Sequence, residues 1–323
     1  MKHPFRSALT AVAAAALSCT VLAQTAGSDK AVMMVVPAAP GGTTDLAARM
    51  LAEPLGKALG QTVVVDNRAG ASGAIAAIAV KRAAPDGNTL LMQYSGYHVI
   101  TPHVVKSAQW EAKDLIAVAN VLSAPQVIVV REGLPVKTMA DLIAYAKANP
   151  DKLTYASSGN GSLQHVTGEM LVQQAGITMT HIPYKGTGPA LQDLLGGRVD
   201  MTFGTPPPFM PHIQAGKLKV LAVTSKTRLP SLPNVPTATE AGLPNLDASS
   251  WFGVFVPAKT PQAMVDKLAA DIAKVVNTPA FQHKATELGA SADYMNPLKF
   301  SDFASSELVR WGKVVKAAKI EAD

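Results

Sequence analysis

The feature that most restricts the fold of this chain is a change from a strand pattern to a helical pattern across one short loop. Residues 31–36 are rich in Val and Met, residues 37–42 hold two prolines and two glycines, and a helical pattern begins at Thr43. Free N–H groups at the start of such a helix carry partial positive charge, so the loop is a candidate seat for a carboxylate. The alternative is a capped turn whose glycines serve only backbone geometry.

The same succession of strand, loop and helix repeats along the chain. Further strands are expected at 62–65, 89–94, 127–130, 153–156, 199–203, 218–224 and 251–256, and further helices at 74–82, 139–148, 163–174, 187–195 and about 301–319. Strands that alternate with helices favour parallel sheets of βαβ units, whose ligands bind beyond the carboxyl ends of the strands. We expect Pro54 to kink or shorten the first helix, Gly60 to end it, and Thr260 to cap a later one.

The N-terminus is typical of a secretory signal peptide. Lys2 and Arg6 precede an apolar stretch, and small residues lead to a cleavage site after Ala23, so residues 1–23 are expected to be removed. The only cysteine, Cys19, lies inside this peptide. Lipoprotein-type cleavage before Cys19 is disfavoured because Ala16 stands where a larger aliphatic residue is preferred. We therefore expect an exported chain that needs no disulfide.

Composition and charge exclude several classes of function. The net charge is +6, but the Lys and Arg residues are scattered and do not alternate with aromatic residues, so nucleic acid is not an expected partner. Two loops, at 37–45 and 157–162, lead into helices. Neither has the residue spacing of a nucleotide phosphate loop, which disfavours a nucleotide-binding enzyme. The histidines show no metal-ligand spacing. We expect no metal and no cofactor.

Three further groups of residues fit either a functional or a structural role. Ser162 and His165 lie three apart on a helix, as a nucleophile and its base would, but the G-x-S-x-G elbow is missing. Asp45 fits the first turn of a helix, where its negative charge interacts favourably with the helix dipole. The functional alternative is a hydrogen bond to a ligand amine or to a bridging water. Lys185 is either a charge for a bound acid or a solvated turn lysine.

Seven stretches in order resemble one family, the Bug-type periplasmic solute-binding receptors of tripartite tricarboxylate transporters. They are VVPAAPGGTTDLAAR, LGQTVVVDNRAGASG, APDGNTLLM, IAYAKANPDKLTYASSGNGS, HIPYKGTGPALQDLLGGRVD, LPNVPTATEAGLP and WFGVFVPAKTP. The resemblance implies a type II periplasmic-binding-protein fold, in which two α/β lobes close over a ligand cleft. It implies that residues 24–122 and 227–323 form the first lobe and that residues 123–226 form the second.

The resemblance also implies where a ligand binds: the first-lobe loop, the second-lobe helix start and three neighbouring segments. Carried onto this sequence, the candidate ligand-binding residues are Ala38, Ala39, Pro40, Gly41, Gly42, Thr43, Thr44, Asp45, Tyr94, Ser95, Ser157, Ser158, Gly159, Asn160, Gly161, Ser162, Tyr184, Lys185, Gly186, Thr187, Phe203, Gly204 and Thr205. The family usually has a bulkier residue in place of Ala38 and Ala39 and often a smaller one in place of Tyr94. We expect a pocket that is widened on one side and walled by a ring on the other.

The expected function is that of a periplasmic, monomeric, non-enzymatic receptor without catalytic residues. It captures a small organic carboxylate by lobe closure and delivers it to integral membrane subunits of a secondary transporter. Tyr94 and the small Ala38–Ala39 pair favour an aromatic or dicarboxylic acid, while tricarboxylates stay open. The alternatives are an exported serine hydrolase that uses Ser162 and His165, and a ligand-sensing accessory protein of a signalling system.

Overall fold

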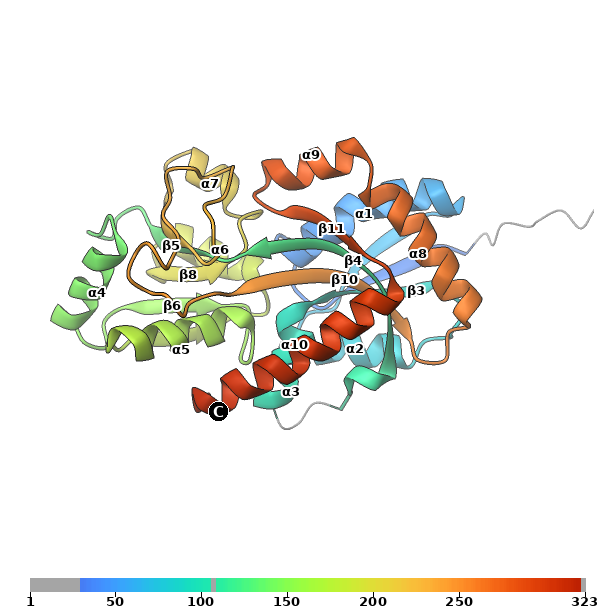
Figure 1. Ribbon diagram of the computed structural model, residues 1–323, viewed down its shortest axis with the longest axis horizontal. Coiled ribbons are helices and arrows are strands. Elements are labelled where there is room, and N and C mark those ends of the chain that lie inside the picture. The colour runs from blue at the N-terminus through green and yellow to red at the C-terminus, as the bar shows by residue number, and fades with distance from the viewer. Residues whose placement is uncertain (1–29, 106–108, 321–323) are drawn as a thin grey trace, which may run out of the picture.

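The computed structural model describes residues 30–105 and 109–320, so the expected signal peptide lies outside the described residues. Two α/β lobes, each built around one mixed sheet, lie end to end along the molecule (Figure 1). We define each lobe by its sheet.

The first lobe holds a six-stranded sheet with the order β11-β4-β10-β3-β1-β2. Its strands are β1 (Val32–Val36), β2 (Val63–Asn67), β3 (Thr89–Tyr94), β4 (Leu115–Pro125), β10 (Ser249–Pro257) and β11 (Ser291–Met295). The helices that accompany it are α1 (Thr43–Leu59), α2 (Ala74–Lys81), α3 (Thr101–Val104), α8 (Gln262–Val276), α9 (Pro279–Glu287) and α10 (Pro297–Ala317), with short turns η1 (Ala71–Gly73), η2 (Gly96–Ile100) and η3 (Ala112–Asp114).

The second lobe holds a five-stranded sheet with the order β7-β6-β8-β5-β9. Its elements are β5 (Val127–Arg131), α4 (Met139–Ala148), β6 (Thr154–Ser157), α5 (Leu163–Ala175), β7 (Thr180–Pro183), α6 (Thr187–Leu195), β8 (Met201–Gly204), α7 (Met210–Gln214) and β9 (Leu218–Val223). The helix α4 begins with a capping box, in which Thr138 and Asp141 each accept a backbone N–H of the other.

The expected parallel pairing is found in part of each sheet and not in the rest. In the first sheet β1 is parallel to β2 and β3, but β10 runs antiparallel to both β3 and β4. In the second sheet β5 runs antiparallel to β8 and β9. The antiparallel strands are those that leave one lobe or return to it, and the residue pattern of a single strand carries no information about direction.

The two lobes are joined where extended segments cross between the sheets. Strand β4 ends at Pro125, one residue follows, and β5 begins at Val127 in the other sheet. Strand β10 lies beside β4 and also extends toward the second lobe (Figure 1). The residue at the crossing is Gln126, whose backbone N–H donates to Ala248 O at 3.2 Å and whose carbonyl accepts from Thr224 N at 2.8 Å. Gln126, Thr224 and Ala248 are therefore tied together where the chain passes between the lobes.

The connection that follows β9 packs with the second lobe. The expected division assigned residues from 227 onward to the first lobe. However, Leu232, Ala238, Leu243 and Leu246 belong to the two apolar clusters that cover the second sheet. The first-lobe cluster instead takes up the chain again at Ala248. A proline-rich segment with little periodicity gave no sign of which lobe would bury its few apolar side chains.

The end of one helix agrees with expectation, and the starts of two others differ. Helix α1 continues through Pro54 to Leu59 and ends at Gly60 in the left-handed region (φ 68°), because Leu51 and Leu55 are fully buried on either side of the proline. Helix α8 begins after Pro261, which stands at the cap position instead of Thr260. Helix α10 begins at Pro297, earlier than expected, and Asn296 caps it.

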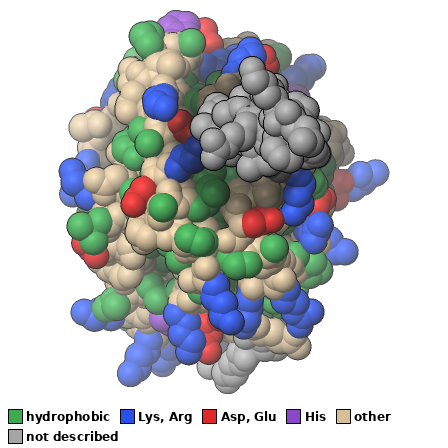
Figure 2. Space-filling model, turned by 90° about the vertical axis from the view of Figure 1, so that its right-hand side faces the viewer, with side chains coloured by type: hydrophobic (Ala, Val, Ile, Leu, Met, Phe, Trp, Pro, Cys, Tyr) green, Lys and Arg blue, Asp and Glu red, His purple; other side chains and the backbone are tan. Residues whose placement is uncertain are grey.

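The surface of the described part of the chain adds two observations. No helix among residues 30–105 and 109–320 is long and apolar enough to span a bilayer. On the face shown in Figure 2, Lys and Arg side chains are spread around the rim and are interspersed with acidic and apolar ones.

Candidate functional site

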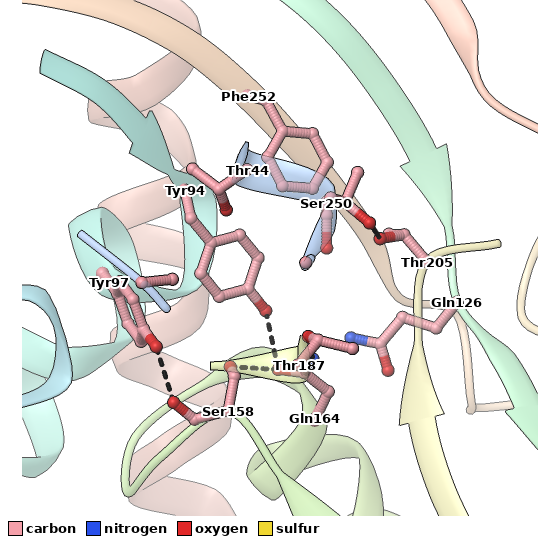
Figure 3. Close-up of a pocket in the computed structure, with 13 residues that line it drawn as sticks. Thr44, Tyr94, Tyr97, Gln126, Ser158, Gln164, Thr187, Thr205, Ser250 and Phe252 are labelled. Atoms are coloured by element: carbon pink, nitrogen blue, oxygen red, sulfur yellow. Dashed lines mark hydrogen bonds between the residues drawn. The ribbon is translucent and has the colours of Figure 1, made fainter. Parts of the chain in front are cut away.

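A small cavity lies between the two lobes, and 13 residues line it (Figure 3). Its atom-free space, counted with the adjoining open solvent, is about 340 Å³. The lining residues come from both lobes and from the crossing between them: Ala38, Gly42, Thr43, Thr44, Tyr94, Tyr97, Gln126, Ser158, Gln164, Thr187, Thr205, Ser250 and Phe252.

The first-lobe wall is the N-terminus of α1. Gly42 is the N-cap residue, no side chain caps the helix, and Thr43 and Thr44 form its first turn. All three residues face the cavity. Because the first N–H groups of a helix have no partner within it, this end can accept an anion. Gly41 precedes it with φ 88°, a conformation that favours glycine.

Asp45 supports this loop from behind and does not line the cavity. Its buried carboxylate accepts hydrogen bonds from Gly41 N at 3.0 Å and from Asn67 Nδ2 at 3.0 Å, and it forms an ion pair with Arg49. Asn67 Nδ2 also donates to Ala38 O at 2.9 Å. The Asp45 carboxylate therefore binds groups of the loop and its neighbours, and it makes no contact with the cavity.

The loop at 157–162 of the second lobe takes a smaller part in the cavity than the sequence suggests. Ser162 caps α5 itself, since its fully buried hydroxyl accepts from His165 N at 3.3 Å. Gly161 N donates to His165 Nδ1 at 3.2 Å, and Ser157 Oγ lies 2.6 Å from His181 Nε2. Of the predicted residues in this loop, the cavity is lined by Ser158 alone.

The N-terminus of α6 takes the place opposite α1. Its cap residue, Gly186, provides no side chain, and Thr187 faces the cavity. Ala39 N donates to Lys185 O across the lobes at 2.9 Å. A Cβ atom on Gly188 would lie only 2.0 Å from Pro40 O, so the two helix ends touch where a side chain could not fit.

An aromatic wall closes one side of the cavity. Tyr94 stacks on Phe252 with ring centroids 5.7 Å apart and meets Tyr97 edge to face at 5.1 Å. The Tyr94 hydroxyl donates to Gln164 Oε1 at 3.3 Å and accepts from Leu163 N at 3.2 Å. Tyr97 donates to Ser158 O at 2.5 Å. Both tyrosines therefore bridge the lobes.

Burial keeps these phenols neutral. It raises the pKa of Tyr97 to about 12 and raises the pKa of Tyr94 further above its usual range. None of the lining residues is Lys, Arg, His, Asp or Glu. An anion in this cavity would be held by N–H and hydroxyl groups without an opposite charge, as in other sites built on helix ends.

The lining includes eight of the predicted residues: Ala38, Gly42, Thr43, Thr44, Tyr94, Ser158, Thr187 and Thr205. Thr205 lies across the lobes from Thr43, with their hydroxyl oxygens 2.6 Å apart. The other predicted residues do not line it and serve the surrounding framework: Ala39, Pro40, Gly41, Asp45, Ser95, Ser157, Gly159, Asn160, Gly161, Ser162, Tyr184, Lys185, Gly186, Phe203 and Gly204. The Lys185 side chain is exposed, and Tyr184 donates its hydroxyl to Asp193.

Five lining residues are absent from the residues carried over from the family: Tyr97, Gln126, Gln164, Ser250 and Phe252. Gln126 stands alone between two apolar strand patterns, which is a weak signal of a functional polar group. Gln164 lies two residues past the cap of α5, and its place near the cavity follows from the helix start. Ser250 and Phe252 lie on β10, whose place beside β3 and β4 only the sheet topology reveals.

In the described part of the chain, Ser162 and His165 form a helix cap and are not placed as a nucleophile and its base. The Ser162 hydroxyl accepts the backbone N–H of His165, which is the geometry of a helix cap. Within residues 30–105 and 109–320 no group of three or more His, Cys, Asp or Glu side chains could hold a metal ion.

Comparisons with known proteins agree on one family. Residues 47–320 match the model of the tripartite tricarboxylate transporter family receptor. Protein BugT of Bordetella pertussis is 36% identical over 307 residues, which cover 94% of this chain and 94% of BugT.

Two solved structures extend the match to the fold. R. palustris Rpa4515 with adipate has a TM-score of 0.88 and 37% identity and covers 90% of this chain and 98% of its own. MatC from Rhodopseudomonas palustris with bound malate has a TM-score of 0.84 and 32% identity, and the match covers 88% of this chain and 98% of the MatC chain. The sequence match over most of the length and the shared two-lobe fold lead to one conclusion: this chain belongs to the receptor family of tripartite tricarboxylate transporters.

Proposed function

We propose that this protein is an exported, periplasmic receptor that captures a small organic carboxylate and delivers it to integral membrane subunits of a secondary transporter. The observation that carries the proposal is the cavity between the lobes, where the ends of α1 and α6 meet without side-chain caps and no charged residue lines the wall. Such a wall suits an anion that is bound by N–H and hydroxyl donors. The adipate and malate complexes of the relatives support the same ligand class.

The mechanism would be closure of the two lobes around the ligand. Contacts such as Tyr94 to Gln164 and Thr43 to Thr205 join residues of different lobes, so they form only when the lobes are close. A ligand that touches both walls stabilises the closed form in proportion to its differential affinity for that form. We place the division between the moving units at Gln126 and Ala248, so that residues 227–248 move with the second lobe.

We infer no catalytic role for this cavity. The candidate ligands are aromatic, dicarboxylic and tricarboxylic acids, and the aromatic wall of Tyr94, Tyr97 and Phe252 suits a flat or short apolar body. The receptor would act as a monomer, because each closure brings together residues of a single chain.

The test is a thermal-shift screen of residues 24–323 against mono-, di- and tricarboxylates, aromatic acids and amino acids. A ligand at one hundred times its Kd stabilises the folded state by about 2.7 kcal/mol and raises Tm by about 5 °C. We expect one class of acid to shift Tm and to be recovered unchanged by mass spectrometry. Consumption of the ligand would show an enzyme, and a panel in which no acid shifts Tm would overturn the carboxylate assignment.

A further inference from the structure

The side chain of Gln126 is a buried amide without hydrogen-bond partners. The residue is 0% exposed, it lines the cavity, and neither its Nε2 nor its Oε1 has a partner. Its backbone is tied to Ala248 and Thr224 at the crossing between the lobes, so the side chain has a fixed origin. Figure 3 shows the amide extending toward Thr187, into the group of lining residues. A buried polar group left unpaired destabilises a protein by about 1–3 kcal/mol, so an amide in this position calls for a ligand.

A second unpaired group lies on the other crossing strand. Ser250 on β10 is 2% exposed and lines the same cavity. Its hydroxyl lies near the Tyr94 phenol but makes no hydrogen bond of 3.5 Å or less. The crossing therefore presents the amide N–H₂ donors, the amide carbonyl acceptor and a hydroxyl that can donate or accept.

The acceptor in this set decides which ligand group fits. An ionised carboxylate has no hydrogen to donate, so a second carboxylate would leave the Gln126 carbonyl buried and unpaired. It would also find no cation, since no Lys, Arg or His lines the cavity. A hydroxyl or a carboxamide both donates and accepts, and can pair with the donor and the acceptor of Gln126 together. Both ends of the amide are unpaired, so this pairing can form in either orientation of the amide.

We propose that Gln126 and Ser250 form a neutral subsite that binds a hydroxyl or carboxamide group of a ligand whose carboxylate lies at the helix ends. This inference rests on the proposed function and narrows it from carboxylates in general to acids that carry such a neutral polar group. The subsite lies where β4, β5 and β10 cross between the lobes, so a ligand that fills it also contacts the point about which the lobes would close.

The test compares ligands of equal length by isothermal titration calorimetry. Butanoate, 4-hydroxybutanoate, succinate and the monoamide of succinate form one set, and the corresponding six-carbon acids form a second. We expect the hydroxy acid and the amide to bind about 3- to 10-fold more tightly than the plain monocarboxylate and more tightly than the dicarboxylate. Gln126→Leu should abolish that preference, so that the hydroxy acid and the amide bind no more tightly than the plain monocarboxylate.

Two further variants keep the result interpretable. Ser250→Ala should reduce the preference by a smaller factor, and it tests the subsite independently if Gln126→Leu does not fold. Gln93→Leu is the matched control, because Gln93 is equally buried and has an unpaired Nε2 but does not line the cavity. We expect the control to leave the ratio of affinities unchanged.

The outcomes separate this inference from the proposed function. If both dicarboxylates bind most tightly and Gln126→Leu weakens all ligands equally, the subsite is wrong while the receptor stands. If hydroxyl and amide groups bring no gain in wild-type protein, the subsite is likewise wrong. If no acid of either set or of the wider panel binds, the proposed function itself fails.

Discussion

The loops before α1 and α5 have similar sequences but opposite roles at the cavity. The loop before α1 ends in Gly42, which has no side chain to cap the helix, and Gly42, Thr43 and Thr44 face the cavity. The loop before α5 ends in Ser162, whose hydroxyl occupies the helix end that a ligand would need. The difference teaches that a polar residue at the cap position competes with a ligand for the same N–H groups. In the second lobe the uncapped end of α6 fills that place.

The largest effect is expected from a side chain at the contact between α6 and the α1 loop. In Gly188→Ala the new Cβ would lie 2.0 Å from Pro40 O, so the two helix ends could not approach as they do. We expect ligand affinity to fall about 100-fold, which corresponds to about 3 kcal/mol, while the fold is kept. Calorimetric titration with the tightest acid measures this. Gly133→Ala is the control, because its Cβ meets only the flexible end of Arg131. Unchanged affinity in Gly188→Ala would refute the assignment of α6 to the cavity.

The next effect concerns the carboxylate that holds the α1 loop. Asp45→Ala removes the acceptor of Gly41 N and of Asn67 Nδ2 and the partner of Arg49. We expect the free energy of unfolding to fall by about 3 kcal/mol and ligand affinity to fall with it, because the loop at the cavity loses its support. Urea denaturation and titration of the same preparation measure both. Asp45→Asn, which keeps one acceptor, should recover part of each loss. A variant that loses stability but binds as wild type would show that the loop is held by other contacts.

Acidic pH should destabilise the loop before α5 more than the loop before α1. Burial, and second the neighbouring His165, lower the pKa of His181 to about 3, and this ring lies beside Ser157. An unfolded histidine titrates near pH 6.5, so below that pH the unfolded chain binds a proton that native His181 does not. The stability that the neutral ring contributes is therefore complete above pH 6.5 and is lost as pH falls toward 3.

The expected loss is about 1–2 kcal/mol between pH 6.5 and pH 5. It is measured as the difference in the pH dependence of urea denaturation between wild type and His181→Gln. His98, whose pKa burial lowers to about 4, contributes in both proteins and cancels from that difference. The exposed His283 provides the control variant His283→Gln. Equal pH dependence in wild type and His181→Gln would show that the loop does not depend on this histidine.

The smallest effect is expected at the cap of α5. Ser162→Ala removes the side-chain acceptor of His165 N and should lower the free energy of unfolding by about 1 kcal/mol. Ligand affinity should stay as in wild type, because Ser162 does not line the cavity. Thermal denaturation and titration check both. A large loss of affinity would return this loop to the binding site, and loss of a hydrolytic turnover would support an enzyme.

Local order along the chain followed from the sequence alone. The apolar runs, the glycine-rich loops and the capping box of Thr138 and Asp141 placed most helices and strands within a few residues, because each depends on neighbours a few positions away. The seven family stretches also predicted the two lobes. They led to the α1 loop and to Tyr94, which line the cavity.

Only the tertiary structure decided which of these groups meet. It paired α1 with α6, brought the Tyr94 hydroxyl to Leu163 N at the start of α5, and packed the segment around Leu243 on the second lobe. It also brought Gln126 and Ser250, 124 positions apart, to one cavity. The physical reason is that facing helix ends, crossings and buried amides depend on contacts between distant parts of the chain, whereas a sequence pattern records only the local preference of each part.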